Sequence, residues 1–416
     1  MLSVSQAEAI ILNLVQPLDH QRDTEVVDLL AATGRILAAP VTSHLDFPHW
    51  DNSAMDGYAV RYTDVQHASS SNPAVLEIVE EIPAGSQPQV PIQPGQAARI
   101  FTGAVMPSGA DTIVIQERTH REDNRVFILA APKPQQFVRY KASFYQAGNQ
   151  LLPAGIMLQA PEIAVLAAAQ CNYLNVFRKV KIALISTGDE LVTPDQPLKP
   201  GQIVDSNQYA LFSALVQMGA EVQMLGIVGD EKQAIQDAIA QAITSADITI
   251  SSGGVSVGDY DYVEQILQLL GGEIQIRAVA VKPGKPLTVA TFAASAETEE
   301  TPRLYFGLPG NPVSALVTFW RFVQPAIKKL SGLASNWETA VVSALTRQDL
   351  RSDGKRESYL WGKLQLIDGV YEFELAGGSH SSGNLINLSQ TNGLAVLPVG
   401  TTLIPQGQEV LVMQVS

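Results

Sequence analysis

Residues 180–191, VKIALISTGDEL, and residues 247–258, DITISSGGVSVG, share one pattern. Each stretch starts with a short, mostly apolar run and ends in a turn of small, polar or acidic residues. A continuous apolar run of this length is typical of a strand buried in a parallel sheet. Because ligands bind where such strands end, the two stretches predict an α/β domain with a polar site at the carboxyl ends of its strands.

Strand-like and helical patterns alternate around these two stretches. The strand-like runs lie at 180–185, 221–228, 247–251, 275–281, 287–291 and 304–307, and the helical ones at 206–218, 231–245, 260–270 and 313–330. This alternation predicts a sheet of parallel type built from βαβ units.

The segments before and after this central part differ from it in the spacing of their apolar residues. Apolar residues recur at helical spacing over 4–15 and again over 23–38, which predicts two helices. Residues 41–150 carry short β-prone runs separated by Pro and Gly, and these predict a small β domain. Short alternating strands return after residue 330 and predict a further compact β unit.

Length and composition restrict the class of protein. A chain of 416 residues exceeds what one hydrophobic core supports, so several domains are expected. Its 41 acidic and 27 basic side chains give a formal net charge of −14, which argues against nucleic acid as a partner. The single cysteine, Cys171, excludes a disulfide framework. No apolar stretch approaches the roughly 20 residues of a membrane span, and the start lacks a cationic signal segment. We therefore expect a cytoplasmic protein without a membrane partner.

Four loops at the predicted βα junctions carry residues suited to a phosphorylated ligand. Glycines allow the backbone to approach a phosphate, lysines neutralise its charge, and free N–H groups at helix starts bind anions. The loops are 186–190 (STGDE), 251–258 (SSGGVSVG), 282–286 (KPGKP) and 307–312 (GLPGNP). Taken alone, 186–190 is better explained as a turn with a capping aspartate, and surface lysines are usually solvated.

The predicted β domain holds one further candidate segment, 51–59 (DNSAMDGYA). Asp56 in this segment could bind a hard cation, and an Asx-turn explains it equally well. The loop that contains Thr102 says little by itself.

Together these segments resemble the molybdopterin molybdenumtransferase family, which comprises the MoeA proteins and the E domain of gephyrin. The resemblance spans nearly the whole chain and rests on 51–59, 186–191, 251–258 with Asp259 and Asp261, 282–286 and 307–315. It implies an elongated homodimer with four domains per protomer. These are an N-terminal helical-β platform at 1–48 completed by 146–178, an inserted β domain at 49–145, the α/β molybdopterin-binding domain at 179–330, and a C-terminal β barrel at 331–416.

The resemblance also implies a reaction. Molybdate would be inserted into adenylylated molybdopterin to give molybdenum cofactor, with release of AMP and with Mg²⁺ as the cation. A molybdopterin adenylyltransferase would act upstream as a partner, and molybdoenzymes would accept the product.

Site residues follow from the same resemblance, position by position. Asp56, Thr102, Glu190 and Asp261 would be catalytic, and Asp56 and Glu190 would bind the metal. The cofactor-binding residues would be Ser186, Thr187, Gly188, Asp230, Ser252, Gly253, Gly254, Ser256, Gly258, Lys282, Lys285, Pro309, Asn311, Arg356 and Ser379.

One segment departs from the family pattern. Family members carry Arg-x-x-Gly-Glu-Asp where this chain has RYKASF at 139–144, so Phe144 replaces a carboxylate. This departure keeps open a second hypothesis, a scaffold that binds molybdopterin without turnover. A third hypothesis is a molybdopterin adenylyltransferase or a pyrophosphatase of related α/β fold, against which the flanking β regions weigh.

Overall fold

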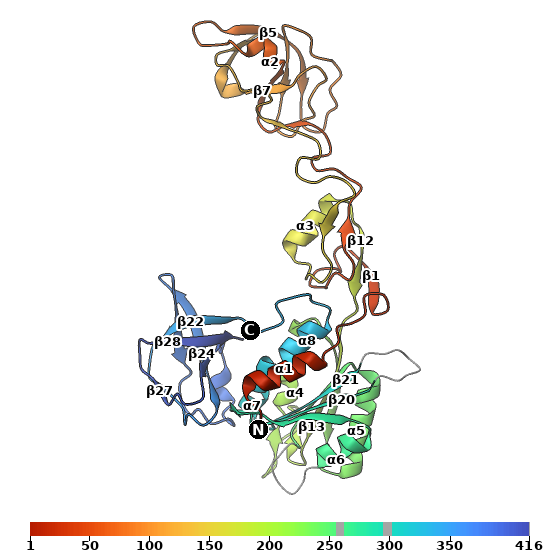
Figure 1. Ribbon diagram of the computed structural model, residues 1–416, viewed down its shortest axis with the longest axis vertical. Coiled ribbons are helices and arrows are strands. Elements are labelled where there is room, and N and C mark those ends of the chain that lie inside the picture. The colour runs from red at the N-terminus through yellow and green to blue at the C-terminus, as the bar shows by residue number, and fades with distance from the viewer. Residues whose placement is uncertain (255–261, 294–301, 416) are drawn as a thin grey trace. The chain divides into compact units, whose positions relative to one another are not determined.

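The computed structural model describes residues 1–254, 262–293 and 302–415, which fold into two compact units (Figure 1). The first unit comprises Met1–Ala39, Ala154–Ile163 and Tyr173–Ser416, and the second comprises Pro40–Pro153 and Ala164–Asn172. The predicted α/β and C-terminal regions lie in the first unit, and the predicted insertion at 49–145 lies in the second. The exact boundaries of the four predicted domains stay predictions.

A six-stranded sheet forms the centre of the first unit, in the order β16-β13-β17-β21-β20-β18. Its strands are β13 (Lys181–Thr187), β16 (Glu221–Val228), β17 (Ile248–Ser252), β18 (Glu273–Ala278), β20 (Pro286–Phe292) and β21 (Arg303–Leu308). The strands β16, β13, β17 and β21 are parallel, as predicted, whereas β20 runs antiparallel to both of its neighbours. The sheet is therefore mixed, because the link between β18 and β20 contains no crossover helix.

Helices cover both faces of this sheet (Figure 1). One face carries α5 (Lys232–Ser245) and α6 (Tyr262–Leu269). The other carries α1 (Val4–Leu14), α4 (Asn207–Gln217) and the pair α7 (Pro312–Thr318) and α8 (Gln324–Leu330), which a π-helical turn at Phe319–Val323 joins. These helices confirm the predicted alternation. Among the described residues, no helix combines the length and apolar character needed to cross a membrane.

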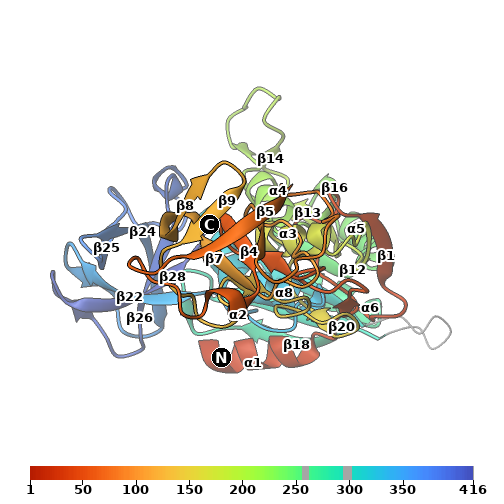
Figure 2. The same cartoon turned by 90° about the horizontal axis from the view of Figure 1, so that it is seen from above.

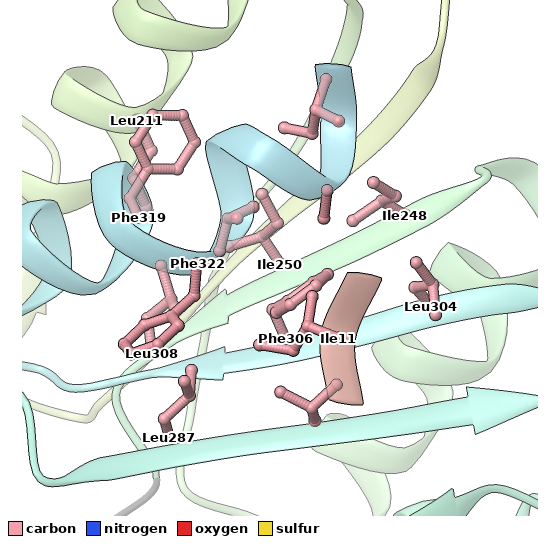
Figure 3. Packing of buried hydrophobic residues seen from close by; sticks show 14 of the residues in the cluster. Ile11, Leu211, Ile248, Ile250, Leu287, Leu304, Phe306, Leu308, Phe319 and Phe322 are labelled. Atoms are coloured by element: carbon pink, nitrogen blue, oxygen red, sulfur yellow. The ribbon is translucent and has the colours of Figure 1, made fainter. Parts of the chain in front are cut away.

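Alternation of side chains along β13 explains why both faces are buried. Ile182 and Leu184 pack into the core beneath α1 and α7, whereas Ala183 and Ile185 pack against α5 and α6. Figure 3 shows the first of these cores, where Phe306 and Ile250 of the sheet meet Phe319 and Phe322. An apolar strand with two covered faces is what the run at 180–185 predicted.

The predicted helix at 23–38 is wrong. Residues Thr24–Asp28 form strand β1, which pairs antiparallel with β12 (Tyr173–Phe177). Asp28 then ends the strand, because its Oδ1 accepts hydrogen bonds from the N–H groups of Leu30 and Ala31. The β-branched residues of β1 gained a distant pairing partner, which outweighed their helical spacing.

The C-terminal region is a closed barrel of five strands, which confirms the predicted barrel. The strands are β22 (Val341–Thr346), β24 (Glu357–Ile367), β25 (Val370–Leu375), β26 (Gly393–Leu397) and β28 (Glu409–Gln414). Closure follows from β24, which pairs with both β25 and β26. The short strand β19 (Val281–Lys282) also pairs with β24 and so links the barrel to the α/β region.

The second unit contains the predicted small β domain. Its sheet has the order β7-β4-β6-β5-β9-β8, with β4 (Gly57–Val60), β5 (Ala74–Ile82), β6 (Gln96–Ile100), β7 (Thr112–Ile115), β8 (Thr119–Glu122) and β9 (Arg125–Ile128). The helix α2 (Tyr62–Val65) follows β4, and the chain later forms α3 (Ala160–Ala168). Three short strand pairs complete the two units: β2 (Val41–Thr42) with β11 (Gln150–Leu152), β3 (Asn52–Ser53) with β10 (Val138–Arg139), and β23 (Leu350–Arg351) with β27 (Leu403–Ile404).

A parallel pair, β14 (Leu191–Val192) and β15 (Ile203–Val204), follows β13. The loop between these two strands extends away from the sheet, as Figure 2 shows beside the label β14. Its return at β15 leads directly into α4, so the start of that helix is placed beside the end of β13.

Candidate functional site

A cavity of about 1020 Å³ lies at the carboxyl edge of the sheet in the first unit. The loops after β13, β17 and β21 line it, together with the segment between β15 and α4. Nine of the predicted site residues contribute to its wall: Thr187, Gly188, Glu190, Asp230, Ser252, Gly253, Gly254, Pro309 and Asn311. The structure thus brings together residues that lie more than a hundred positions apart in the chain.

Glycine at 253 is required by the packing of the loops. Gly253 has a φ of 90°, and a Cβ there would lie 2.4 Å from the carbonyl oxygen of Thr187. Gly310 lies against the same residue, because a Cβ on Gly310 would be 3.6 Å from the Cα of Gly253. The backbones of three loops therefore meet closely. The N–H of Gly253 itself donates to the carbonyl of Leu308 at 3.3 Å, which ties the loop after β17 to the end of β21.

We expect Gly253→Ala to destabilise the protein more than Gly34→Ala. Both glycines have positive φ values, 90° and 76°, but a Cβ on Gly34 would meet no atom within 4 Å. The shared backbone strain costs about 1 kcal/mol, and the clash at 253 adds roughly 1–3 kcal/mol. Urea unfolding of both variants measures the difference, and equal losses would contradict the close packing.

Three carboxylates lie at the rim of the cavity. Asp189 and Asp230 bind each other's backbone: Asp230 N–H donates to Asp189 Oδ1 at 3.0 Å, and Asp189 N–H donates to Asp230 Oδ2 at 3.4 Å. Glu190 lies above Gly188, whose Cβ position would be 2.6 Å from Glu190 Oε2. The described residues bring together no three His, Cys, Asp or Glu side chains that could hold a metal ion.

The predicted cations lie beside the cavity and do not line it. Lys282 Nζ forms an ion pair with Asp353 Oδ2 at 2.9 Å, and this bond lowers the pKa of the Asp353 carboxyl. Arg356 donates to the carbonyl of Val281 at 3.0 Å, so the barrel places its guanidinium next to Lys282. Lys285 is exposed on the same loop, and this loop ends at Pro286, which lines the cavity.

A turn of the barrel closes one side of the cavity through Gly383 and Leu385. Its backbone docks on α7, since Val313 N–H donates to Ser382 O at 3.1 Å. Ser379 belongs to this turn, and its carbonyl accepts from the side chains of Asn384 and Asn387. The ring of His380 packs against that of Trp361, with centroids 5.1 Å apart and planes tilted by 57°, and burial lowers the pKa of His380.

The second unit holds Asp56 and Thr102 in direct contact. Asp56 Oδ1 accepts hydrogen bonds from Thr102 N–H and from Thr102 Oγ1, both at 2.7 Å. The backbone bond and then the hydroxyl bond lower the pKa of Asp56, which keeps its carboxylate ionised at neutral pH. Both hydrogen bonds reach the same oxygen, Oδ1, so Oδ2 can coordinate a cation.

The remaining predicted residues fall elsewhere. Ser186 is buried behind the cavity, where its Oγ lies 3.4 Å from both Ser252 Oγ and Gln208 Nε2. Ser256, Gly258 and Asp261 lie outside the described residues.

Sequence reasoning missed the stretch Asp205-Ser206-Asn207, which lines the cavity at the start of α4. Its signal was available, because three polar residues follow a short apolar pair at a βα junction. It also missed Tyr262 and, in the barrel turn that contains the predicted Ser379, the lining residues Gly383 and Leu385.

This geometry defines a class of protein: a multidomain α/β protein with a large, glycine-lined cavity where parallel strands end. Comparison with known proteins specifies it further. The chain matches the MoeA N-terminal region (domain I and II) over residues 2–169, a probable molybdopterin binding domain over 183–329, and the MoeA C-terminal region (domain IV) over 343–415.

Relatives cover the chain from end to end. A molybdopterin molybdenumtransferase of a Nostoc species is 64% identical over 414 residues, covering 100% of this chain and 94% of that protein. One from Haemophilus influenzae is 34% identical over 384 residues, with 91% of each chain covered. The crystal structure of the molybdopterin biosynthesis MoeA protein from Pyrococcus horikoshii OT3 has a TM-score of 0.84 at 26% identity, covering 100% of both chains.

The chain therefore belongs to the molybdopterin molybdenumtransferase family, and it is an enzyme of molybdenum cofactor biosynthesis. This confirms the resemblance drawn from the sequence. Matches to the N-terminal and C-terminal regions also weigh against the adenylyltransferase hypothesis, which did not require those flanking regions.

Proposed function

We propose that this protein inserts molybdate into adenylylated molybdopterin and releases AMP, with Mg²⁺ as the required cation. The observation that carries the proposal is the cavity at the carboxyl edge of the sheet, where glycine loops from β17 and β21 meet the loop after β13. A ligand with a pterin, a diphosphate and a nucleoside needs such a large site with close backbone approach.

Each group of residues has a separate role in this proposal. The backbone at Gly253 and Gly254 holds the diphosphate, while Thr187, Ser252, Pro309 and Asn311 line the space for the organic parts. Lys282, Lys285 and Arg356 supply positive charge for molybdate and for the leaving phosphate. Attack of water on the diphosphate bond releases AMP. The two thiols of the substrate bind the molybdenum, and their protons leave with one molybdate oxygen as water.

Asp56 in the second unit and Glu190 in the first would each bind Mg²⁺ through a carboxylate. Carboxylate oxygens are the ligands this ion prefers, and the ionised Asp56 with an available Oδ2 fits that chemistry. When bound, the ion supplies positive charge to the phosphate that leaves. Thr102 keeps the Asp56 carboxylate in one orientation through its two hydrogen bonds. Asp230 would contribute a further polar contact at the sheet edge. The predicted catalytic residue Asp261 lies outside the described residues.

We further propose the biological setting. The protein would act as a cytoplasmic homodimer, receive its substrate from a molybdopterin adenylyltransferase, and deliver the product to molybdoenzymes. The substrate carries an activated diphosphate and two sulfurs prone to oxidation, so direct transfer between successive enzymes would protect it.

A reconstitution assay tests the function. Purified protein is incubated with adenylylated molybdopterin, molybdate and Mg²⁺, and AMP is measured together with activation of a cofactor-free molybdoenzyme. AMP release coupled to activation supports the proposal. Tight pterin binding without turnover would favour the scaffold hypothesis, and ATP consumption with molybdopterin would favour the adenylyltransferase.

Phe144 provides a test of the missing carboxylate. The side chain is 73% exposed, so Phe144→Asp should change the free energy of unfolding by no more than about 0.5 kcal/mol. If the family carboxylate helps to bind the cation, this variant should reach half-maximal turnover at about tenfold less Mg²⁺. That shift corresponds to ~1.4 kcal/mol in the free energy of Mg²⁺ binding. Phe144→Asn serves as the control, because Asn has the same size as Asp but carries no charge. Equal Mg²⁺ dependence of all three proteins would show that another group already fills the role.

A further inference from the structure

Asp205 is a buried carboxylate with an unpaired oxygen in the wall of the cavity. It is 3% exposed and follows β15 at the start of α4. Its Oδ1 accepts a hydrogen bond from the N–H of Gln208 at 3.2 Å. Its Oδ2 is buried and has no hydrogen-bond partner among the described residues.

Such an arrangement is costly for a protein in the absence of a ligand. Buried polar atoms are nearly always hydrogen-bonded, and a buried charge without a partner is the most unfavourable case. Thr187, which is 4% exposed, has a second unpaired oxygen, Oγ1, in the same wall. The Thr187 hydroxyl can donate or accept a hydrogen bond, whereas the carboxylate oxygen of Asp205 can only accept one. The ligand of this cavity must therefore bring a donor to Asp205.

Three contacts fix the position of Asp205 and so exclude a simple rearrangement. Its own N–H donates to the carbonyl of Val192 at 2.9 Å, and Oδ1 is held by Gln208. Asn207, which is two positions after Asp205, donates through Nδ2 to the carbonyl of Gly310 at 2.7 Å. This bond ties the segment to the loop after β21, so Oδ2 is held in place before any ligand arrives.

We propose that Asp205 Oδ2 accepts a hydrogen bond from a neutral O–H or N–H donor of the bound substrate. The inference rests on the proposed function, because it assigns part of the same cavity to the organic portion of adenylylated molybdopterin. Two portions offer this chemistry: the ribose hydroxyls of the adenylate and the amino edge of the pterin. A phosphate is excluded at this position, since it carries the same charge as the carboxylate.

Asp205 thereby orients the substrate. The glycine loops favour the diphosphate, and the carboxylate of Asp205 repels it and selects a donor group instead. A ligand can satisfy both only in one direction along the cavity. Asp205 is thus a substrate-binding residue that sets which end of the ligand lies at the start of α4.

Two variants separate recognition from folding. Asp205→Asn keeps an oxygen for the N–H of Gln208 and places an N–H₂ group at the position of Oδ2, where it faces the donor of the ligand. Asp205→Ser is also a good capping residue and removes the charge. Asp28→Asn is the matched control, because Asp28 caps a turn through Oδ1 outside the cavity wall. Unfolding temperatures of all variants show whether each is folded.

Equilibrium binding is measured with three probes: AMP, 2′,3′-dideoxy-AMP and molybdopterin. Asp205→Asn should weaken binding of either AMP or molybdopterin by about 10- to 100-fold, as expected for loss of a charge-assisted hydrogen bond. Binding of the other probe should stay within about twofold. If the ribose is the donor, the wild-type protein prefers AMP to the dideoxy compound and the variant does not. If the pterin is the donor, molybdopterin binding alone is lost.

The inference is overturned if folded Asp205→Asn and Asp205→Ser bind AMP and molybdopterin as tightly as the wild-type protein. It is also overturned if Asp28→Asn loses as much affinity as they do. A wild-type protein that binds both probes and forms no cofactor contradicts the proposed function alone. A wild-type protein that binds neither probe contradicts both.

Discussion

Replacement of Asp56 by Asn is expected to lower the rate of AMP release by about 100-fold or more. The substitution removes the negative charge that would hold Mg²⁺, while the two hydrogen bonds from Thr102 to Oδ1 can persist. Preorganised charge at a reacting phosphate is usually among the largest contributions to catalysis. Single-turnover measurement of AMP release with saturating substrate checks this result.

The control for Asp56 is a similar carboxylate in the same unit. Asp64 Oδ2 accepts a backbone hydrogen bond from Gly95 at 2.9 Å, and Asp64→Asn should leave the rate of AMP release unchanged. If the lost charge bound the ion, a higher Mg²⁺ concentration should partly restore the rate of AMP release by Asp56→Asn. An Asp56→Asn protein with wild-type turnover would show that Asp56 does not take part in catalysis.

Replacement of Arg178 by Met is expected to lower the free energy of unfolding by about 3–5 kcal/mol. Arg178 Nε contacts Asp23 Oδ1 at 2.9 Å, and its two terminal nitrogens contact the carboxylate of Asp247 at 2.7 and 2.8 Å. The two acidic side chains are only 10% and 15% exposed. Without the guanidinium, both largely buried carboxylates lose a charged partner, which is the costly way to break an ion pair. Asp23 keeps its contact with Arg22 at 3.3 Å, and Asp247 keeps the N–H of Lys181 at 2.7 Å.

Urea unfolding at neutral pH measures this loss, with Arg277→Met as the control. Arg277 pairs with Glu264 at 2.8 Å but is 57% exposed, so its loss should cost less than about 1 kcal/mol. Similar losses in the two variants would contradict the role of Arg178.

Acidification should reduce the difference in free energy of unfolding between the wild-type protein and Arg178→Met. Burial alone raises the pKa of Asp23, but hydrogen bonds from Asp19 N–H and Arg178 outweigh it and lower the pKa. A lowered pKa stabilises the folded state above the unfolded value near 4, and this stabilisation is lost as the pH falls through the folded value. In the variant the pKa of Asp23 is lowered less, because the hydrogen bond and the charge of Arg178 are absent, so less stability remains to be lost in acid. Unfolding midpoints at pH 7 and pH 3 test this convergence.

The sequence alone determined the elements whose signals are local. The apolar runs at 180–185 and 247–251 predicted strands buried on both faces, and the loops after them predicted a cavity at one edge of the sheet. Parallel strands followed by helices place their carboxyl ends together, so local order along the chain was sufficient. The resemblance named Asp56 and Thr102 among the catalytic residues, and the structure brings these two into contact.

Tertiary structure decided what depends on distant partners. Residues 24–28 have helical spacing, yet they form a strand because 173–177 offers a complementary edge. The antiparallel direction of β20 follows from its two neighbours in the sheet, which periodicity does not reveal. Asp205 has the sequence of an ordinary capping residue, and only the packing around it leaves one oxygen buried without a partner. Strand pairing and unpaired buried atoms are properties of neighbours far apart in the chain, whereas helix and strand patterns belong to each segment by itself.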